Sequence, residues 1–392
     1  MNCTACNASL PDDAAFCMAC GVRQAGSASL SLSSSGGHIR RLVPPEYLDR
    51  LMSASRSVSG SRRLVTMLFF DVTGSTSMFE GRDPEDVMEI MNEAFAALMP
   101  PVYRYEGTLA RLMGDGVLAF FGAPVSHVDD AARACAAALE IRDASRRFAA
   151  SLEARRGIGG FDVRIGLNTG LVVVGEVGDD HRVEYTAMGD AVNVAARLES
   201  SAAPGTVLVS GDTRALVTTG FEFESVGNLA LKGRADAVPA WRLLGRSSIA
   251  EEHSDPGIDW EVLAAAWDED GGAEIPADAR ALLQAHIDGL PAASRRVLLT
   301  ASVINAPFGR ALLEQSLRFD AQDWVLDHAL DPLLVAGFLE AGDSGDAAQY
   351  QITYPIVREV AYGSLLKSHR KLLHRRVEQA IQVLDRNSGR EA

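Results

Sequence analysis

Residues 62–245 alternate between strand-like and helix-like patterns, and this order constrains the fold more than any other feature of the chain. An apolar run over 64–70 predicts a buried first strand that ends at Asp71. Asp83-Pro84-Glu85 predicts a helix start, because it offers a capping carboxylate and a proline in the first turn. The other expected elements are helices near 129–149 and 190–200, strands near 108–113, 117–121, 161–167, 171–174, 207–209 and 241–244, and a turn at 168–170. The resulting strand–helix–strand–strand–helix–strand order predicts an α+β fold with helices packed on an antiparallel sheet.

The chain has 392 residues, which is enough for two or three domains. Its net charge of −15 argues against general binding of polyanions. No apolar run reaches the roughly 18 residues that a membrane span needs, and no signal-peptide pattern is visible, so we expect a soluble cytoplasmic protein. The expected organisation is a cysteine module at 1–22, a linker with a short helix at 23–61, the α+β domain at 62–245, an acidic linker at 246–280 and a helical region at 281–392.

Two carboxylates stand at the ends of predicted strands. Asp71 follows the first strand, and Asp115 lies between two glycines in a predicted hairpin turn. Rigid strand ends can hold a pair of divalent cations, although Asp in such turns also has purely structural roles. Gly74 would let backbone amides approach phosphate oxygens, and the small hydroxyl residues Ser75 and Thr76 follow it.

Asn193 and Arg197 are four residues apart on the helix predicted near 190–200, so they share one face of it. An arginine offers several donors to charge that spreads over phosphate oxygens. A surface asparagine and a solvated arginine would give the same pattern. Together with the two acids, however, this pair favours a site that handles a nucleoside triphosphate with divalent metals.

Several motifs in residues 62–245 resemble, in order, those of the catalytic domain of class III adenylate cyclases. They are Phe70-Asp71-Val-Thr-Gly-Ser-Thr76, Leu112-Met-Gly-Asp115-Gly, Arg164-Ile-Gly-Leu-Asn-Thr-Gly170, Gly189-Asp190-Ala-Val-Asn193-Val-Ala-Ala-Arg197 and Leu231-Lys232-Gly233. The resemblance implies a ferredoxin-like cyclase fold and a homodimer with two sites shared across its interface. It further implies two Mg²⁺ or Mn²⁺ ions held by Asp71, Asp115 and the backbone carbonyl of Val72.

The same resemblance implies that Asn193 and Arg197 serve the transition state from the other subunit. It also implies that Lys232 reaches the triphosphate, for which a solvated loop lysine is the alternative reading.

Arg111 and Thr186 occupy the two positions at which this family reads the purine base. The family usually has Lys at the position of Arg111, and many members have Asp at the position of Thr186. A Thr at the second position resembles the subgroup called IIIb, some of whose members respond to bicarbonate. Arg111 can donate to adenine N1 or guanine O6, and Thr186 can accept from the exocyclic amine of either purine, so the chemistry alone rejects GTP only weakly. The resemblance therefore decides for ATP, and it predicts an adenylate cyclase that forms cyclic AMP and pyrophosphate.

The bulk of the Arg111 side chain keeps a second reading open. In that reading, the cyclase domain is degenerate and acts as a regulatory or protein-binding module.

Four of the five cysteines form two CxxC pairs separated by ten residues: Cys3 with Cys6, and Cys17 with Cys20. This spacing predicts a tetrahedral thiolate site for structural Zn²⁺, and the segment resembles a short zinc ribbon. No Lys or Arg and one aromatic residue lie between the outer cysteines, which makes nucleic-acid binding unfavourable and favours a structural or protein-contact role. The fifth, Cys135, stands at a helical core position and is expected to pack there.

Residues 290–384 resemble the winged-helix part of STAND-type ATPase modules, on the segments Leu290–Ile304 and Val357–Leu366. No GxxxxGK[ST] motif occurs in the chain, so a second phosphate-binding loop of this kind is not expected. We therefore expect a remnant used for packing, regulation or contact with a protein partner. The basic tract at 367–376 is predicted to be the solvated face of an amphipathic helix; a nucleic-acid surface, the alternative, would show salt-dependent DNA retention.

Overall fold

The computed structural model describes residues 61–179, 182–217, 219–230, 237–247, 258–261, 277–317, 326–342 and 349–388. One compact unit holds the described residues from Arg63 to Ser247, and a second holds those from Ile258 to Ser388. The predicted zinc ligands Cys3, Cys6, Cys17 and Cys20, the short helix predicted within the linker at 23–61 and Lys232 lie outside the described residues. Within the described ranges, no helix is both long enough and apolar enough to span a bilayer.

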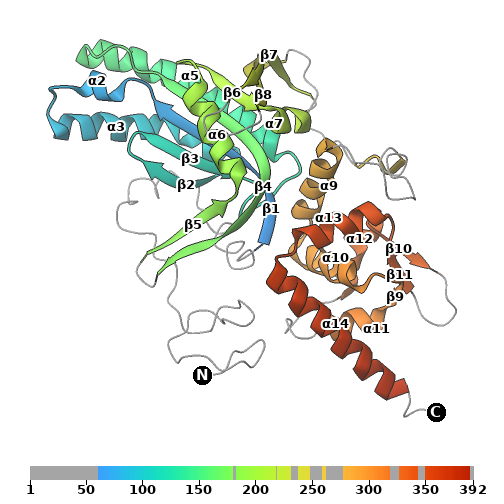
Figure 1. Ribbon diagram of the computed structural model, residues 1–392. Coiled ribbons are helices and arrows are strands. Elements are labelled where there is room, and N and C mark those ends of the chain that lie inside the picture. Colours follow the sequence, from blue (N-terminus) through green and yellow to red (C-terminus); the bar gives the residue numbers. More distant parts are fainter. Residues whose placement is uncertain are drawn as a thin grey trace. The chain divides into compact units, whose positions relative to one another are not determined.

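The first unit is built on an eight-stranded sheet with the strand order β2-β3-β1-β4-β6-β8-β7, and β5 pairs with β4 off this path (Figure 1). The strands are β1 Ser61–Val72, β2 Thr108–Met113, β3 Gly116–Phe121, β4 Val163–Asp179, β5 Arg182–Met188, β6 Val207–Ser210, β7 Phe221–Leu229 and β8 Val238–Arg246. The neighbours β2-β3-β1-β4, with helices between β1 and β2 and between β3 and β4, have the ferredoxin-like order. The predicted α+β class is confirmed for this unit.

The helices of this unit are α2 Ser75–Phe79, α3 Pro84–Leu98, α4 Pro100–Arg104, α5 Asp130–Arg156, α6 Asp190–Ser201 and α7 Gly211–Leu216. Helix α3 begins where the sequence predicts. The Asp83 carboxylate caps it by accepting a 2.8 Å hydrogen bond from the Glu85 amide, and Pro84 is its first residue.

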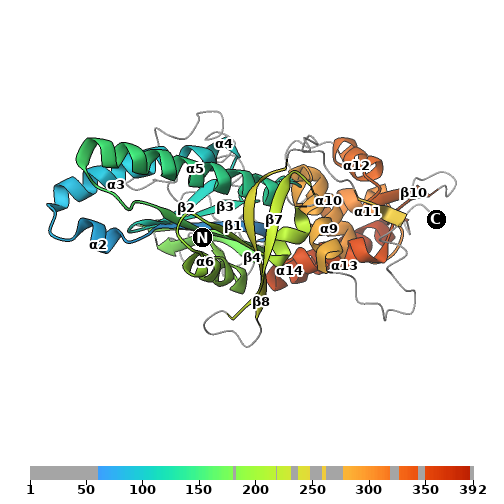
Figure 2. The same ribbon diagram turned by 90° about the horizontal axis from the view of Figure 1, so that it is seen from above.

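Strand β1 is covered on both faces, which explains its unbroken apolar run. Leu68 and Phe70 pack into a core with side chains of α3, α4 and α5, whereas Met67 and Phe69 pack with side chains of α6 on the opposite face. Figure 2 shows α3 and α5 on one side of the sheet and α6 on the other. The end of β1 is therefore held rigidly between two layers of helices.

The turn predicted at 168–170 is wrong, because β4 continues through these residues without interruption. The glycines of this segment serve helix packing instead of a turn. A Cβ added at Gly166 would lie 2.5 Å from the Ala195 carbonyl oxygen, and one added at Gly170 would lie 2.6 Å from the Ala191 Cβ. Both positions admit only glycine while α6 keeps its close approach to β4.

The second unit combines helices with a three-stranded antiparallel sheet of order β10-β11-β9, which helical periodicity alone did not predict. Its elements are α9 Ala277–Gly289, α10 Ala292–Ile304, β9 Phe308–Gly309, α11 Arg310–Leu317, α12 Leu326–Val335, β10 Leu339–Gly342, β11 Gln349–Ile352, α13 Pro355–Ser364 and α14 Lys367–Ser388. Its core includes Leu298, Leu313, Leu330 and Val357. A buried ion pair joins Arg295 to Asp288 at 2.9 Å.

Trp260 lies in the segment predicted as an acidic linker, yet it packs against the second unit. Its ring stacks on Tyr354 with the centroids 5.2 Å apart and meets Phe338 edge-on at 5.5 Å. Its Nε1–H donates to the Ala336 carbonyl at 3.1 Å. The linker prediction therefore does not hold at this residue.

Candidate functional site

Strands β1 and β3 bring the two predicted acids together at one end of the sheet. Asp71 of β1 pairs in register with Gly116, the first residue of β3. Asp115 directly precedes Gly116 in the tight hairpin turn, where Gly114 has a left-handed φ of 67°. A Cβ at Gly116 would lie 3.4 Å from Asp71 Oδ1. The register of one strand pair thus places two carboxylates side by side, as the sequence predicts.

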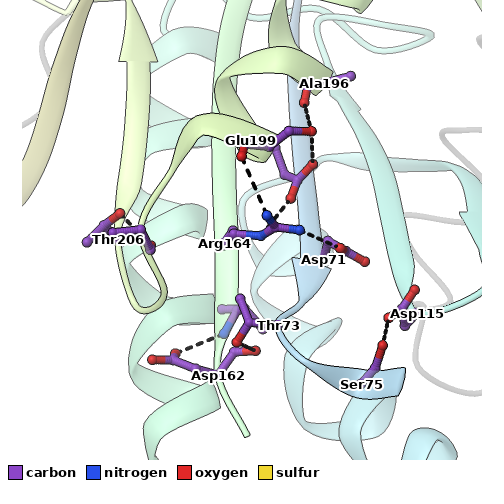
Figure 3. A network of polar contacts seen from close by, with 12 residues as sticks. Asp71, Thr73, Ser75, Asp115, Asp162, Arg164, Ala196, Glu199 and Thr206 are labelled. Carbon is purple, nitrogen blue, oxygen red and sulfur yellow. Dashed lines mark hydrogen bonds and ion pairs between the residues drawn. The ribbon is translucent and has the colours of Figure 1, made fainter. Parts of the chain in front are cut away.

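The segment that follows β1 contributes a hydroxyl group to this pair. Gly74 adopts a left-handed φ of 66° at the start of α2, and the Ser75 hydroxyl then donates to Asp115 Oδ2 (Figure 3). Ser75 is thus engaged with a carboxylate, whereas the sequence suggested a phosphate contact. The Thr73 hydroxyl donates to the Asp162 carbonyl at 3.1 Å and fastens the turn to the start of β4. The side chain of Thr76 lies outside the described residues.

Arg164 of β4 links Asp71 to a third carboxylate, Glu199 of α6. Its Nη2 donates to Asp71 Oδ2 at 3.0 Å, and its Nε lies 3.3 Å from Glu199 Oε1 without hydrogen-bond alignment. Figure 3 shows the guanidinium group between the two acids. The Glu199 side chain is 10% exposed, compared with 28% for Asp71. Two carboxylates therefore flank one guanidinium group at this end of the sheet, and Asp115 adds a further negative charge beside Asp71.

The charges of this cluster are not fully compensated. Burial raises the pKa of Asp71 above its ordinary value, and the negative charge of Asp115 raises it further, while the hydrogen bond from Arg164 opposes both effects. Burial also raises the pKa of Glu199, and the positive charge of Arg164 opposes this shift. An additional positive charge near Asp71 would lower the electrostatic energy of the cluster.

The donor set at Asp71 and Asp115 consists of hard oxygen atoms, which suit Mg²⁺ or Mn²⁺ better than softer metals. Burial and the negative charge of Asp115 both raise the pKa of Asp71, and a divalent cation would relieve the repulsion between the two carboxylates. No group of three or more His, Cys, Asp or Glu side chains is placed to hold a metal within the described ranges. A cation here would therefore need backbone, water or nucleotide oxygens to complete its coordination. The predicted carbonyl donor, Val72, is the buried last residue of β1.

Helix α6 is fixed on β4 by contacts along one face of the strand. Besides the two glycines, the Asn168 side-chain amide donates to the Ala191 carbonyl in the first turn of the helix at 2.8 Å. Arg164 holds the last turn through Glu199 and donates to the Ser200 carbonyl at 3.5 Å. These contacts determine where the residues between the two ends of the helix lie.

Asn193 and Arg197 stand on this helix, as predicted. Asn193 is exposed and Arg197 is half-buried. Arg197 Nη1 is buried and has no hydrogen-bond partner among the described residues. Neither side chain forms a hydrogen bond or ion pair with Asp71 or Asp115 within the described part of one chain. A buried guanidinium nitrogen without a partner is costly, and an anionic ligand would satisfy it.

The two predicted base-reading residues lie on different strands. Arg111 is exposed on β2, next to an irregularity in its pairing with β3. The backbone of Thr186 pairs with Gly175 in the ribbon of β4 and β5, but the Thr186 side chain lies outside the described residues.

Arg164 and Glu199 are the site residues that sequence reasoning missed. Arg164 opens one of the quoted motifs, but it was given no role. Glu199 follows Arg197 by two residues and lies on the buried side of α6, although a helical glutamate usually faces solvent. The signal for Glu199 was a charged residue on the apolar side of a helix, which indicates a paired charge. Arg164 stands at a polar position of the strand alternation and carries no such signal.

Residues 58–245 match the family model described as adenylate and guanylate cyclase catalytic domain. The chain is similar to Adenylate cyclase 1 of Rhizobium meliloti (strain 1021), with 38% identity over 186 residues that cover 47% of this chain and 28% of that protein. It is also similar to two crystal structures. The adenylyl cyclase CyaB from P. aeruginosa has 28% identity and a TM-score of 0.47, and the match covers 49% of this chain and 100% of that one. The guanylyl cyclase Cya2 has 34% identity and a TM-score of 0.46, and the match covers 49% of this chain and 98% of that one. The chain covers less than a third of the length of the first curated relatives it matches.

Proposed function

We propose that residues 58–245, which match the model of the adenylate and guanylate cyclase catalytic domain, convert ATP into cyclic AMP and pyrophosphate at sites shared across a homodimer. The observation that carries this proposal is the juxtaposition of Asp71 and Asp115 by the register of β1 and β3. Two rigid carboxylates with excess negative charge are suited to Mg²⁺ or Mn²⁺, the ions that class III cyclases use. The proposal extends to this domain alone.

In the proposed reaction, the ribose 3′-oxygen bonds to the α-phosphorus while the bond from that phosphorus to the bridging oxygen breaks. Pyrophosphate leaves, and the proton of the 3′-hydroxyl passes to solvent. When bound, the two cations favour the 3′-oxyanion and steady the charge of the triphosphate. The chain's own part is mostly to hold the reacting groups in line and to stabilise charge.

Asp71 and Asp115 would hold the cations, with the backbone carbonyl of Val72 as a further donor. The hydroxyl of Ser75 keeps the Asp115 carboxylate oriented, and Arg164 orients Asp71 until a cation binds there. Gly74, exposed at the start of α2, leaves the nearby backbone open to phosphate oxygens, and we place Thr76 and Lys232 in the same role.

Asn193 and Arg197 would act from the partner subunit. Within the described ranges, the buried Nη1 of Arg197 has no hydrogen-bond partner, and this supports the role, because such a donor can be satisfied by charge that develops on the phosphate oxygens. Their lack of contact with Asp71 and Asp115 within one chain is consistent with a site completed by a second copy.

We propose ATP as the substrate because the similar curated protein from Rhizobium meliloti is named an adenylate cyclase. The proposed base readers are Arg111, as a donor to adenine N1, and Thr186, as an acceptor from the exocyclic amine. Neither group excludes guanine by its chemistry, so the substrate must be measured.

The test is a product assay on the purified full chain with ATP or GTP and with Mg²⁺ or Mn²⁺. We expect cyclic AMP in excess over cyclic GMP, and we expect Asp71→Ala to reduce product formation by at least about 10²-fold. Excess cyclic GMP would overturn the substrate assignment. A folded chain that makes neither product with either metal would favour the degenerate, regulatory reading of the domain.

A further inference from the structure

Glu199 is the least exposed member of the carboxylate cluster and has no role in the proposed reaction. Its side chain is 10% exposed, and its Oε2 accepts a 3.1 Å hydrogen bond from the Ser200 hydroxyl. Its backbone is pressed against β4 at Gly166, where an added Cβ would lie 2.3 Å from the Glu199 nitrogen. The carboxylate is therefore held firmly beside Arg164.

Arg164 makes two unequal contacts with its acids. Its bond to Asp71 Oδ2 is 3.0 Å long and aligned, whereas its Nε is 3.3 Å from Glu199 Oε1 and not aligned. Asp71 thus holds the guanidinium more tightly in this structure. Only a small movement of Arg164 would align its contact with Glu199.

A divalent cation at Asp71 would compete with Arg164 for the same carboxylate and repel its positive charge. A cation that binds Asp71 through Oδ2 displaces Arg164 from that oxygen. If Asp71 were its only acidic partner, this release would leave a partly buried guanidinium unpaired, which is strongly unfavourable. A second acid at 3.3 Å makes the release much less costly.

We propose that Glu199 is a positioning residue that takes over Arg164 when a divalent cation binds Asp71, and so sets the affinity of the site for that cation. This inference rests on the proposed function for the role of Asp71. Glu199, at the buried end of α6, would thus act in metal binding, whereas Asn193 and Arg197 on the same helix would act on the transition state.

The test is binding of Mn²⁺ to the full chain without nucleotide, followed by the electron paramagnetic resonance signal of free Mn²⁺, with Asp71→Ala as the blank. We expect Glu199→Gln to weaken the Asp71-dependent binding by about tenfold, in the range typical of residues that orient metal ligands. Glu199→Asp keeps the charge but shortens the side chain away from Arg164, and it should also weaken binding. Glu222→Gln, which removes one exposed charge from β7, is the matched control and should bind as the wild type does.

The decisive comparison uses Arg164→Met. In that background there is no guanidinium to take over, so adding Glu199→Gln should leave Mn²⁺ affinity unchanged. Equal weakening with and without Arg164 would overturn the inference, because it would reveal a direct effect of charge. Unchanged binding in both Glu199 variants would overturn it as well. If the wild type and Asp71→Ala bind Mn²⁺ alike, the proposed function itself fails at Asp71.

Discussion

Gly166 of β4 lies against the backbone of Glu199 in α6, so closely that a Cβ added to this glycine would come within 2.3 Å of the Glu199 nitrogen. The contact belongs to a set along one face of β4, together with Asn168 in the middle of the face and Gly170 beyond it. Alternate residues of a strand point to the same side, and here that side supports one helix. The position of Asn193 on α6 is therefore a consequence of how tightly β4 and α6 approach.

Gly166→Ala should lower the free energy of unfolding by about 1–3 kcal/mol, because the neighbouring atoms are backbone and cannot move aside cheaply. It should also reduce cyclic nucleotide formation by displacing α6. Urea unfolding and the product assay check the two effects. Gly245→Ala in β8 is the matched control, since nothing lies within 4 Å of its added Cβ, and it should change stability by less than about 0.5 kcal/mol. Equal behaviour of the two variants would contradict the tight contact.

A mixture of two inactive variants tests the shared site. Asp71→Ala and Arg197→Ala chains should each be inactive alone. In a mixed dimer, one of the two sites would combine an intact Asp71 with an intact Arg197, whereas the other would lack both. Random exchange into symmetric dimers should therefore restore about a quarter of wild-type activity. If refolded mixtures that contain the mixed dimer stay inactive, the two residues do not serve a common site.

Much of the first unit could be predicted from local signals. The apolar run of β1, the capped start of α3 at Asp83 and the hairpin around Gly114 each depend on residues close in sequence. Gly170 does not lie in the turn that the sequence predicts, because a glycine in a strand looks the same whether it forms a turn or makes room for a helix. The helix that decides between these roles begins at Asp190, twenty residues further along the chain.

In the candidate site, too, some contacts could be predicted from the sequence and others could not. Asp71 and Asp115 could be predicted to meet, because both stand at the ends of apolar strands and the hairpin fixes their order. The role of Arg164 could not, since its partners lie 93 residues before it and at the far end of α6. Of this cluster, only Glu199 leaves a trace in the sequence, as a charge on the apolar side of a helix.

Asp130 gives a pH-dependent test in the same unit, at the start of α5. Burial raises its pKa, and hydrogen bonds from the His127 backbone and ring oppose the shift only in part. Because the folded state binds this proton more tightly than the unfolded state, wild-type stability should fall as the pH rises from about 4 through the raised pKa. Asp130→Asn cannot titrate there.

The variant should therefore gain stability relative to the wild type as the pH rises from about 4 through the raised pKa, as followed by urea unfolding at closely spaced pH values. His127, Asp129, Glu106 and Arg133 are the charged or titratable neighbours of this carboxyl, and they are the same in both proteins. A difference in stability that stays constant over this range would show that the Asp130 pKa is not raised.

Cys135 packs in the core of the first unit as the sequence predicts, and it is fully buried. Burial raises the pKa of its thiol to about 12, so almost no thiolate exists at pH 8. We expect the peptide that contains Cys135 to stay unlabelled by iodoacetamide in the folded chain and to react in urea, as measured by mass spectrometry. Rapid labelling of this peptide without denaturant would contradict its burial.

Trp260 provides the corresponding test for the second unit, because its ring is placed by Tyr354 and Phe338 and its Nε1–H is bonded to the Ala336 carbonyl. Trp260→Ala should lower the free energy of unfolding of this unit by about 3 kcal/mol, the low end for a large aromatic side chain, since the ring is only partly buried. Trp260→Phe keeps an aromatic face but loses the hydrogen bond, and it should cost about 1 kcal/mol. Urea unfolding of both variants measures whether Trp260→Ala loses more stability than Trp260→Phe. If Trp260→Ala unfolds as the wild type does, the tryptophan is a passive part of a linker after all, as its acidic surroundings in the sequence suggested.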